Sequence, residues 1–235
     1  MRIEILYPEI CTLYGDKANG RYLKECLPQE EFIFTPISEY PAFLNGDIDV
    51  VYICSMSEKN QEKVIEKLNG RRAELDAAFA GNTFFFMTGN AFEVFGKRIL
   101  REDKSEIAGL GIFDCYSVRQ SPKRFNSLTM GSFGDTEIVG YTSRFSHTFE
   151  CSETPLFEVT LGSGLNPGSK KEGIERENVW ATYTLGPLLI ANPYFTKKLL
   201  AKIGRPADTI PYEEAMVKAY DVKKEEYKKP GLELA

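Results

Sequence analysis

The sequence predicts an α/β fold in which a mostly parallel central sheet, with an antiparallel section, lies between layers of helices. Strand and helix patterns alternate through the first hundred residues, as in doubly wound sheets with right-handed crossovers. Two segments of that region, 47–56 and 83–89, are apolar runs typical of strands buried on both faces. From residue 107 to 161 the pattern changes to short alternating segments, which favour antiparallel pairing.

The first half of the chain divides into strands and helices in strict succession. In order, we expect a strand within 1–10, a loop and helix over 11–29, strands over 32–38 and 47–56, a helical segment over 57–82, a strand over 83–89, and a helix or turn over 90–99. Ser57 is the expected N-cap of the helical segment, because its hydroxyl can accept a hydrogen bond from the first turn.

The second half is expected to contain short strands, one polar loop and two helices. Strands are predicted over 111–120, 126–133, 136–149, 156–161 and 178–186, a Gly-rich surface loop over 162–177, and helices over 193–204 and 212–231. No linker or internal repeat interrupts this order, so we expect one domain over residues 1–235.

Bulk composition excludes several functional classes. A formal net charge of -5 and a pI near 5.2 disfavour nucleic-acid and anionic-membrane binding, which need a basic surface. The five cysteines are scattered without metal-ligand spacing, so no metal or other cofactor is expected. No apolar run approaches the ~20 residues that span a bilayer, and the charged N-terminus does not resemble a secretory signal. We therefore expect a cytoplasmic protein.

Two local features bear on catalysis. The stretch FFFMTGNAFEVFG, residues 84–96, predicts a buried strand, a sharp turn and a helix, the arrangement in which many α/β enzymes hold a nucleophile. His147 is the single histidine of the chain. Any mechanism that needs a histidine general base must therefore use this residue.

Several segments, in order across nearly the whole chain, resemble one enzyme family. LYPEICTLYGDKAN (6–19), GLGIFDCYSVRQSPKRFNS (109–127) and GSGLNPGSKKEGIERENVWATYTLGPLLIANP (162–193) resemble motifs of the CobB/CobQ-like class I glutamine amidotransferases. The resemblance is nearest to the amidotransferase subunit, of the GatD type, of lipid II isoglutaminyl synthase. It implies a class I glutamine amidotransferase-like, flavodoxin-like three-layer sandwich.

The resemblance also places the family's catalytic positions. Active members carry C-G-G-Y-Q-x-L-G at the strand-to-helix turn, where the cysteine thiolate attacks the glutamine amide. Aligning the last glycine of that motif with Gly96 puts Gly89 at the cysteine position, Asn90 and Ala91 at the two glycines, and Glu93 at the glutamine. Glycine has no side chain with which to attack.

The family's histidine in Y-x-H-G-P corresponds to Leu185, which cannot transfer a proton. Two further motifs depart as well: a Gly-rich G-G-G-Q-D turn becomes CSMSE (54–58), and G-F-E-N-H-G becomes GYTSRF (140–145). Because glycines let the backbone approach a substrate, their replacement predicts a reshaped or closed pocket.

Other family positions are kept. They are Tyr14, Gly15, Asp16, Asn19, Lys123, Arg124, Glu172 and Gly173. In active relatives the Lys-Arg stretch helps to position the glutamine. Arg124 and Asp16 are therefore candidates for contact with a substrate carboxylate or a partner, although solvated charges or structural ion pairs are equally consistent with the sequence.

The remaining candidates have two interpretations each. Gly89 serves a left-handed turn, or, with Asn90, it cradles an anion with backbone N–H groups. Cys54 is a relocated nucleophile or a small buried hydrophobe. His147 pairs with a cysteine or is an ordinary hydrogen-bonded residue.

Three functional hypotheses follow. The leading one is a catalytically degenerate amidotransferase-like protein that acts as a structural, regulatory or ligand-binding subunit. Active relatives supply ammonia to a Mur-ligase-like, ATP-dependent synthetase, which is the implied partner. The alternative is an active amidotransferase or glutaminase that uses a non-standard nucleophile, such as Cys54 with His147. The third is a sensor that binds a small amino acid in the vacant pocket.

Overall fold

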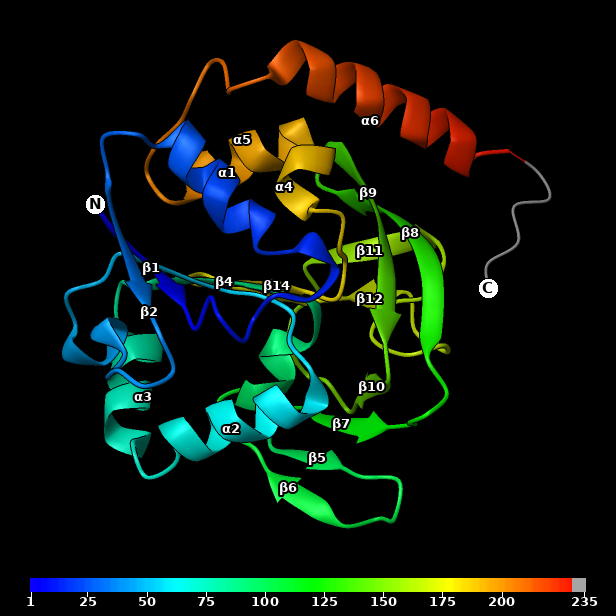
Figure 1. Ribbon diagram of the computed structural model, residues 1–235. Coiled ribbons are helices and arrows are strands. Elements are labelled where there is room, and N and C mark those ends of the chain that lie inside the picture. The colour runs from blue at the N-terminus through cyan, green and yellow to red at the C-terminus, as the bar shows by residue number, and fades with distance from the viewer. Residues whose placement is uncertain (230–235) are drawn as a thin grey trace.

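The computed structural model describes residues 1–229 and places a six-stranded sheet at the centre of the molecule (Figure 1). The strand order is β13-β14-β4-β3-β1-β2. The strands are β1 (Arg2–Leu6), β2 (Glu31–Thr35), β3 (Val50–Ile53), β4 (Phe84–Thr88), β13 (Ile174–Arg176) and β14 (Val179–Thr182). All neighbours pair in parallel except β13 and β14, which are antiparallel. The predicted α/β class and its mostly parallel sheet are confirmed.

Helices cover both faces of this sheet and make the three layers (Figure 1). One face carries α1 (Ala18–Cys26), α4 (Leu188–Ala191) and α5 (Pro193–Lys202), with α6 (Glu213–Tyr227) outside them. The other carries α2 (Glu58–Leu68), α3 (Arg72–Ala80) and the 3-10 helix η3 (Gly89–Phe95). Short 3-10 helices η1 (Leu13–Gly15) and η2 (Ala42–Asn45) lie in connections.

The antiparallel section consists of two four-stranded sheets beside the central one. One has the order β10-β7-β5-β6 and the other β12-β11-β8-β9. Their strands are β5 (Arg98–Leu100), β6 (Glu106–Ala108), β7 (Tyr116–Arg119), β8 (Phe125–Phe133), β9 (Thr136–Arg144), β10 (Ser146–Phe149), β11 (Phe157–Leu161) and β12 (Lys171–Glu172). Pairing is antiparallel as predicted, except that β5 and β7 run parallel.

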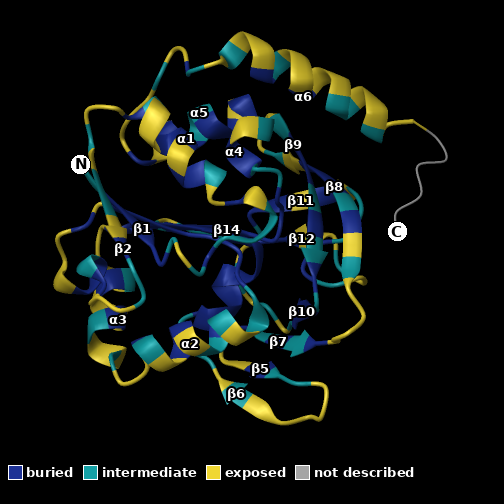
Figure 2. Ribbon diagram, viewed as in Figure 1, coloured by how far each residue is buried: buried dark blue, intermediate teal, exposed yellow. Residues whose placement is uncertain are grey.

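The central strands form the core, as their sequence predicts (Figure 2). Every residue of β3 and β4 is buried, because helices cover both faces of the sheet. Aromatic side chains fill the space between β4 and α3: the Phe79 and Phe85 rings stack with centroids 4.0 Å apart.

Three predicted elements differ in the structure. The strand expected over 136–149 is divided into β9 and β10, which belong to different sheets. The helical segment expected over 57–82 is two helices, broken after Leu68 where Gly70 takes φ +80°, a conformation that glycine adopts readily. Ser57 caps the first of them by accepting a hydrogen bond from Asn60 N at 3.3 Å. The loop expected over 162–177 contains β12 and β13, because tertiary pairing overrides its polar, Gly-rich composition.

The terminal helix agrees with its prediction in the part that can be compared. It was expected over 212–231 and is observed as α6, which ends at Tyr227, two residues before the end of the described range; residues 230 and 231 lie outside that range. Within residues 1–229 no helix is both long and apolar enough to cross a bilayer.

Candidate functional site

Three chain segments meet where the parallel strands β14, β4 and β3 end side by side. Gly89 follows β4 with φ +63°. A Cβ built on Gly89 would lie 2.4 Å from Ser55 Cβ and 3.3 Å from Leu185 Cδ2. The turn therefore brings together the residues that align with the family's nucleophile, glycine-rich turn and base, although they are far apart in the sequence.

The segment after β3 is hydrogen-bonded onto this turn. Ser55 Oγ donates to Leu13 O at 2.9 Å. The Asn90 side chain pairs with the backbone of Met56, accepting from its N at 3.0 Å and donating to its O at 2.8 Å. Both polar ends of the Asn90 side chain are thus engaged within the protein, where they join the two strand ends.

Asp16 forms hydrogen bonds to several residues at this same edge of the sheet. It is fully buried, and its carboxylate accepts hydrogen bonds from Thr88 Oγ1, from Asn19 Nδ2 at 2.7 Å and from Ser55 N at 3.3 Å. Burial raises its pKa to about 6. Asn19 continues the connection by accepting from Leu189 N at 2.9 Å. Asp16 therefore holds η1, β3 and β4 together, and this burial leaves it no surface with which to contact a ligand.

Glu93, at the family's glutamine position, is also buried. Its carboxylate accepts hydrogen bonds from Ser146 Oγ, from Tyr183 Oη at 2.6 Å and from Gln61 Nε2 at 2.9 Å. Burial raises its pKa. Glu93 thus fixes η3 against β10, α2 and the residue that follows β14.

Glu172 has the corresponding role on the other side of Tyr183. It accepts from Thr182 Oγ1 at 2.6 Å and from Tyr183 N at 2.7 Å, and burial raises its pKa to about 7. These bonds fix the end of β14 just before Leu185. Backbone hydrogen bonds between Leu185 and Tyr141 then bring the segment 140–145 alongside.

A cavity of about 170 Å³ opens above these strand ends. Its lining comes from six regions of the chain: Leu13 and Tyr14; Ser55, Met56, Ser57 and Glu58; Gly89 and Asn90; Arg124; Ser143, Arg144 and Phe145; and Tyr183. Ser55 and Leu185 occupy the space beside Gly89; that the pocket is reshaped relative to active family members stays a prediction.

Arg124, a residue singled out from the sequence, lies exposed at this cavity. Its guanidinium donates to Tyr14 Oη and, at 3.4 Å, to Ser143 Oγ, and lies 4.4 Å from the centroid of the Phe145 ring. The kept residues Tyr14 and Arg124, from opposite halves of the chain, therefore meet at one wall.

Arg144 is a cavity residue that the sequence analysis did not identify. It is 3% exposed and donates to Gly164 O at 2.7 Å and to Thr142 Oγ1 at 3.1 Å. Its guanidinium lies 3.8 Å from the centroid of the Tyr183 ring. The altered motif at 140–145 was the signal that could have found it.

Cys54 and His147, the alternative catalytic pair, have other partners. The Cys54 thiol donates to Cys11 O at 2.9 Å, and burial raises its pKa well above the ordinary value. The His147 ring packs edge-on against Phe125, and burial with the nearby Arg144 charge lowers its pKa to about 4. Neither residue lines the cavity, so the geometry lends no support to a dyad.

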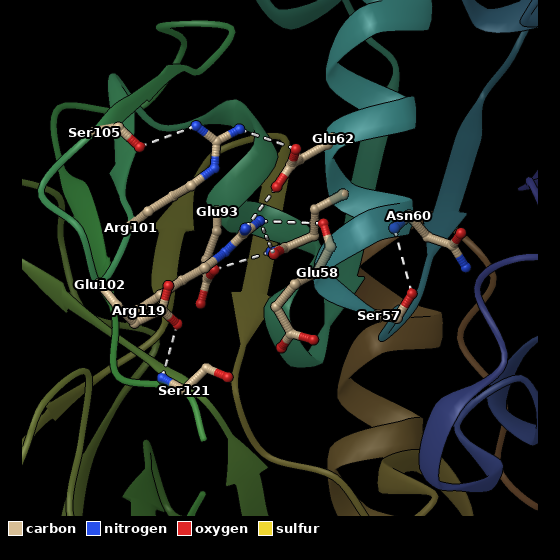
Figure 3. Close-up of polar contacts among 11 residues, drawn as sticks. Ser57, Glu58, Asn60, Glu62, Glu93, Arg101, Glu102, Ser105, Arg119 and Ser121 are labelled. Atoms are coloured by element: carbon tan, nitrogen blue, oxygen red, sulfur yellow. Dashed lines mark hydrogen bonds and ion pairs between the residues drawn. The ribbon is translucent and has the colours of Figure 1, made fainter. Parts of the chain in front are cut away.

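Beside the turn, an ion-pair network joins α2 to the β5–β7 sheet (Figure 3). Arg119 reaches Glu62 at 2.6 Å, and Arg101 reaches the other oxygen of Glu62 at 3.0 Å. Burial opposes ionisation of Glu62, but the bonds from Arg119 and Arg101 outweigh it and lower its pKa. Arg119 also donates to Gln61 Oε1 at 3.3 Å, and Gln61 contacts Glu93. Through Gln61, this network is connected to Glu93 of η3.

In residues 1–229 no cluster of three or more His, Cys, Asp or Glu side chains is arranged to hold a metal ion.

Comparisons with known proteins agree on one family. The family model of the CobB/CobQ-like glutamine amidotransferase domain matches residues 2–193. Two relatives are described as lipid II isoglutaminyl synthase (glutamine-hydrolyzing) subunit GatD. The one from Staphylococcus aureus (strain N315) is 28% identical over 166 residues, which is 71% of this chain and 68% of the relative. The one from Streptococcus pneumoniae (strain ATCC BAA-255 / R6) is 22% identical over 234 residues, which is 92% of this chain and 87% of the relative.

Solved structures show the same fold. A glutamine amidotransferase crystal structure matches with a TM-score of 0.56 at 12% identity, covering 86% of this chain and 98% of the other. A glutamine amidotransferase from Thermotoga maritima matches with a TM-score of 0.51 at 8% identity, covering 95% of this chain and 92% of the other. The three-layer arrangement is that of class I glutamine amidotransferases.

Proposed function

Because this chain belongs to the CobB/CobQ-like glutamine amidotransferase family, we propose that it is a catalytically degenerate member that does not hydrolyse glutamine by the Cys-His route. The observation that carries the proposal is the meeting of Gly89, Ser55 and Leu185. A glutaminase of this kind needs a thiol and a base within hydrogen-bond reach of one another. Here the first position has no side chain, the last is a hydrocarbon, and Ser55 Cβ lies 2.4 Å from where a Cβ at position 89 would be.

We further propose that the protein, as one domain over residues 1–235, acts as a subunit of a larger assembly. Its relatives are subunits of a lipid II isoglutaminyl synthase by name. Motif residues kept from the family, such as Asp16, Asn19 and Glu172, build the fold around the strand ends. A chain that keeps this frame without the nucleophile suits a structural or regulatory role beside a Mur-ligase-like synthetase.

The experiment is ammonia release from glutamine by the purified protein, alone and with any synthetase that copurifies with it. An active family member serves as the positive control. We expect no release above background, because neither Gly89 nor Leu185 can form or assist a thiolate. Release that persists through purification would overturn the proposal.

The same assay tests the non-standard nucleophile. Cys54→Ala and His147→Ala would each abolish residual turnover if these residues were catalytic. Burial disfavours the Cys54 thiolate that attack requires, so we expect neither substitution to change the background rate.

A further inference from the structure

Arg144 is a buried cation without an ion-pair partner. Within residues 1–229 it forms no salt bridge, and its Nε has no hydrogen-bond acceptor. The buried Arg119, in contrast, is paired with Glu62 at 2.6 Å. Burying an arginine without a counter-charge is costly, and stacking on Tyr183 offsets only part of that cost.

Two buried carboxylates, Glu93 and Glu172, act on the charge of Arg144 from a distance but form no ion pair with it. Glu93 and Glu172 lie beyond ion-pair distance of Arg144, and both are occupied by neutral donors: hydroxyls, an amide or a backbone N–H. Burial raises the pKa of each, and the Arg144 charge opposes part of that rise. Within residues 1–229, Arg144 thus lines the cavity without a direct ion-pair partner and with an unpartnered Nε.

A second cation, Arg124, lies on the same cavity. It is exposed, donates to Tyr14 and Ser143 and, within the described part of the chain, belongs to no salt bridge. Of the cavity's lining residues, Glu58 alone is acidic. The volume of about 170 Å³ is below the ~300–1,000 Å³ typical of drug-sized sites, which limits a ligand to roughly the size of an amino acid.

We propose that this cavity binds a small dicarboxylate, one carboxylate on the buried Arg144 and the other on the exposed Arg124. The proposal builds on the proposed function, since it names the ligand class of the cavity left by the lost catalytic groups. Arginine presents a planar fork of donors that matches a carboxylate. Binding two carboxylates sets this site apart from one built for glutamine, whose side chain ends in a neutral amide.

The test is calorimetric titration and thermal shift with glutarate, L-glutamate and L-glutamine as probes. Glutarate and L-glutamate should bind and raise the Tm, since a ligand of the native state stabilises it. L-glutamine should bind at least tenfold more weakly, because it lacks the second charge. Equal affinity for L-glutamine and L-glutamate, no binding of either dicarboxylate, or the same Tm shift from sulfate would overturn the proposal.

Substitutions of Arg144 and Arg124 test whether these residues bind the two carboxylates. Arg144→Gln should weaken glutarate binding at least tenfold and remove the preference for L-glutamate over L-glutamine. If Arg144→Gln does not fold, Arg144→Lys, which keeps the charge without the fork, and the exposed Arg124→Gln provide the same comparison. Arg98→Gln, an exposed change outside the cavity, is the control and should bind as the native protein does. Native-like binding by Arg144→Lys and Arg124→Gln together would refute the assignment.

The ammonia assay on the same samples separates the two proposals. Ammonia release would overturn the degenerate function while leaving the dicarboxylate preference measurable. Loss of the preference without ammonia release would overturn only the anion site.

Discussion

The crowding around Gly89 can be measured by adding one methyl group. In Gly89→Ala the new Cβ would lie 2.4 Å from Ser55 Cβ and 3.1 Å from Ser55 Cα, distances that require something to move. The residue also has φ +63°, where a side chain costs ~1–2 kcal/mol. Overpacking adds ~1–3 kcal/mol. We expect Gly89→Ala to lower the free energy of unfolding by ~2–5 kcal/mol.

Gly46 is the matched control. It has φ +83°, but a Cβ there would meet nothing within 4 Å. Gly46→Ala should therefore show the backbone cost alone, ~1–2 kcal/mol. The difference between the two variants isolates the steric contact with Ser55.

Ser55→Gly completes a double-mutant cycle. On its own it loses the hydrogen bond to Leu13 O, worth ~1 kcal/mol. In the Gly89→Ala background it also removes the clashing Cβ, so we expect a favourable coupling of at least ~1 kcal/mol. Urea unfolding with linear extrapolation measures all of these free energies. Equal losses in Gly89→Ala and Gly46→Ala, or simple additivity with Ser55→Gly, would show that the turn is not crowded.

Further predictions concern activity, pH and the joined strand ends. The triple variant Gly89→Cys, Ser55→Gly, Leu185→His should release more ammonia from glutamine than Gly89→Cys alone, because only the triple variant supplies nucleophile, base and space; equal rates would contradict this. Glu172 has a pKa raised to about 7, so the folded state holds its proton more tightly than the unfolded chain. Its contribution is complete below about pH 4 and is lost as the pH rises through about 7. Glu172→Gln should therefore reduce the fall in unfolding free energy between pH 5 and 8, and a slope unchanged from the native protein would argue against a buried proton. Asn90→Ala should cost ~1–3 kcal/mol, since it leaves two buried groups of Met56 unpaired; a loss below ~0.5 kcal/mol would remove its joining role.

The role of Asp16 could not be decided from the opening motif (6–19) alone. The resemblance identified Asp16 as a kept residue but left open whether it binds a ligand or serves the fold. The structure shows its carboxylate accepting bonds from Thr88, Asn19 and Ser55. The bonds from Thr88 and Ser55 cannot be read from the spacing of the motif, because these donors lie 72 and 39 residues away in the chain.

The local sequence pattern alone predicted the sheet class, the buried strands β3 and β4, and the N-cap at Ser57. These features depend on the period of apolar residues and on hydrogen bonds within one turn. The break between α2 and α3 was missed, although Gly70 marked it. The strands β12 and β13 were also missed, because their pairing depends on β11 and β14 rather than on their own composition.

Motif comparison predicted the absence of a nucleophile at Gly89 and of a base at Leu185, since the identity of a side chain is a property of the sequence. The tertiary structure decided what fills their place. Ser55 reaches Gly89 because β3 and β4 are neighbours in the sheet, and Arg144 reaches the cavity because β9 pairs with the backbone of Leu185. Contacts between residues far apart in the chain are set by which strands pair and in what register, and local sequence specifies that only through the packing of the whole fold.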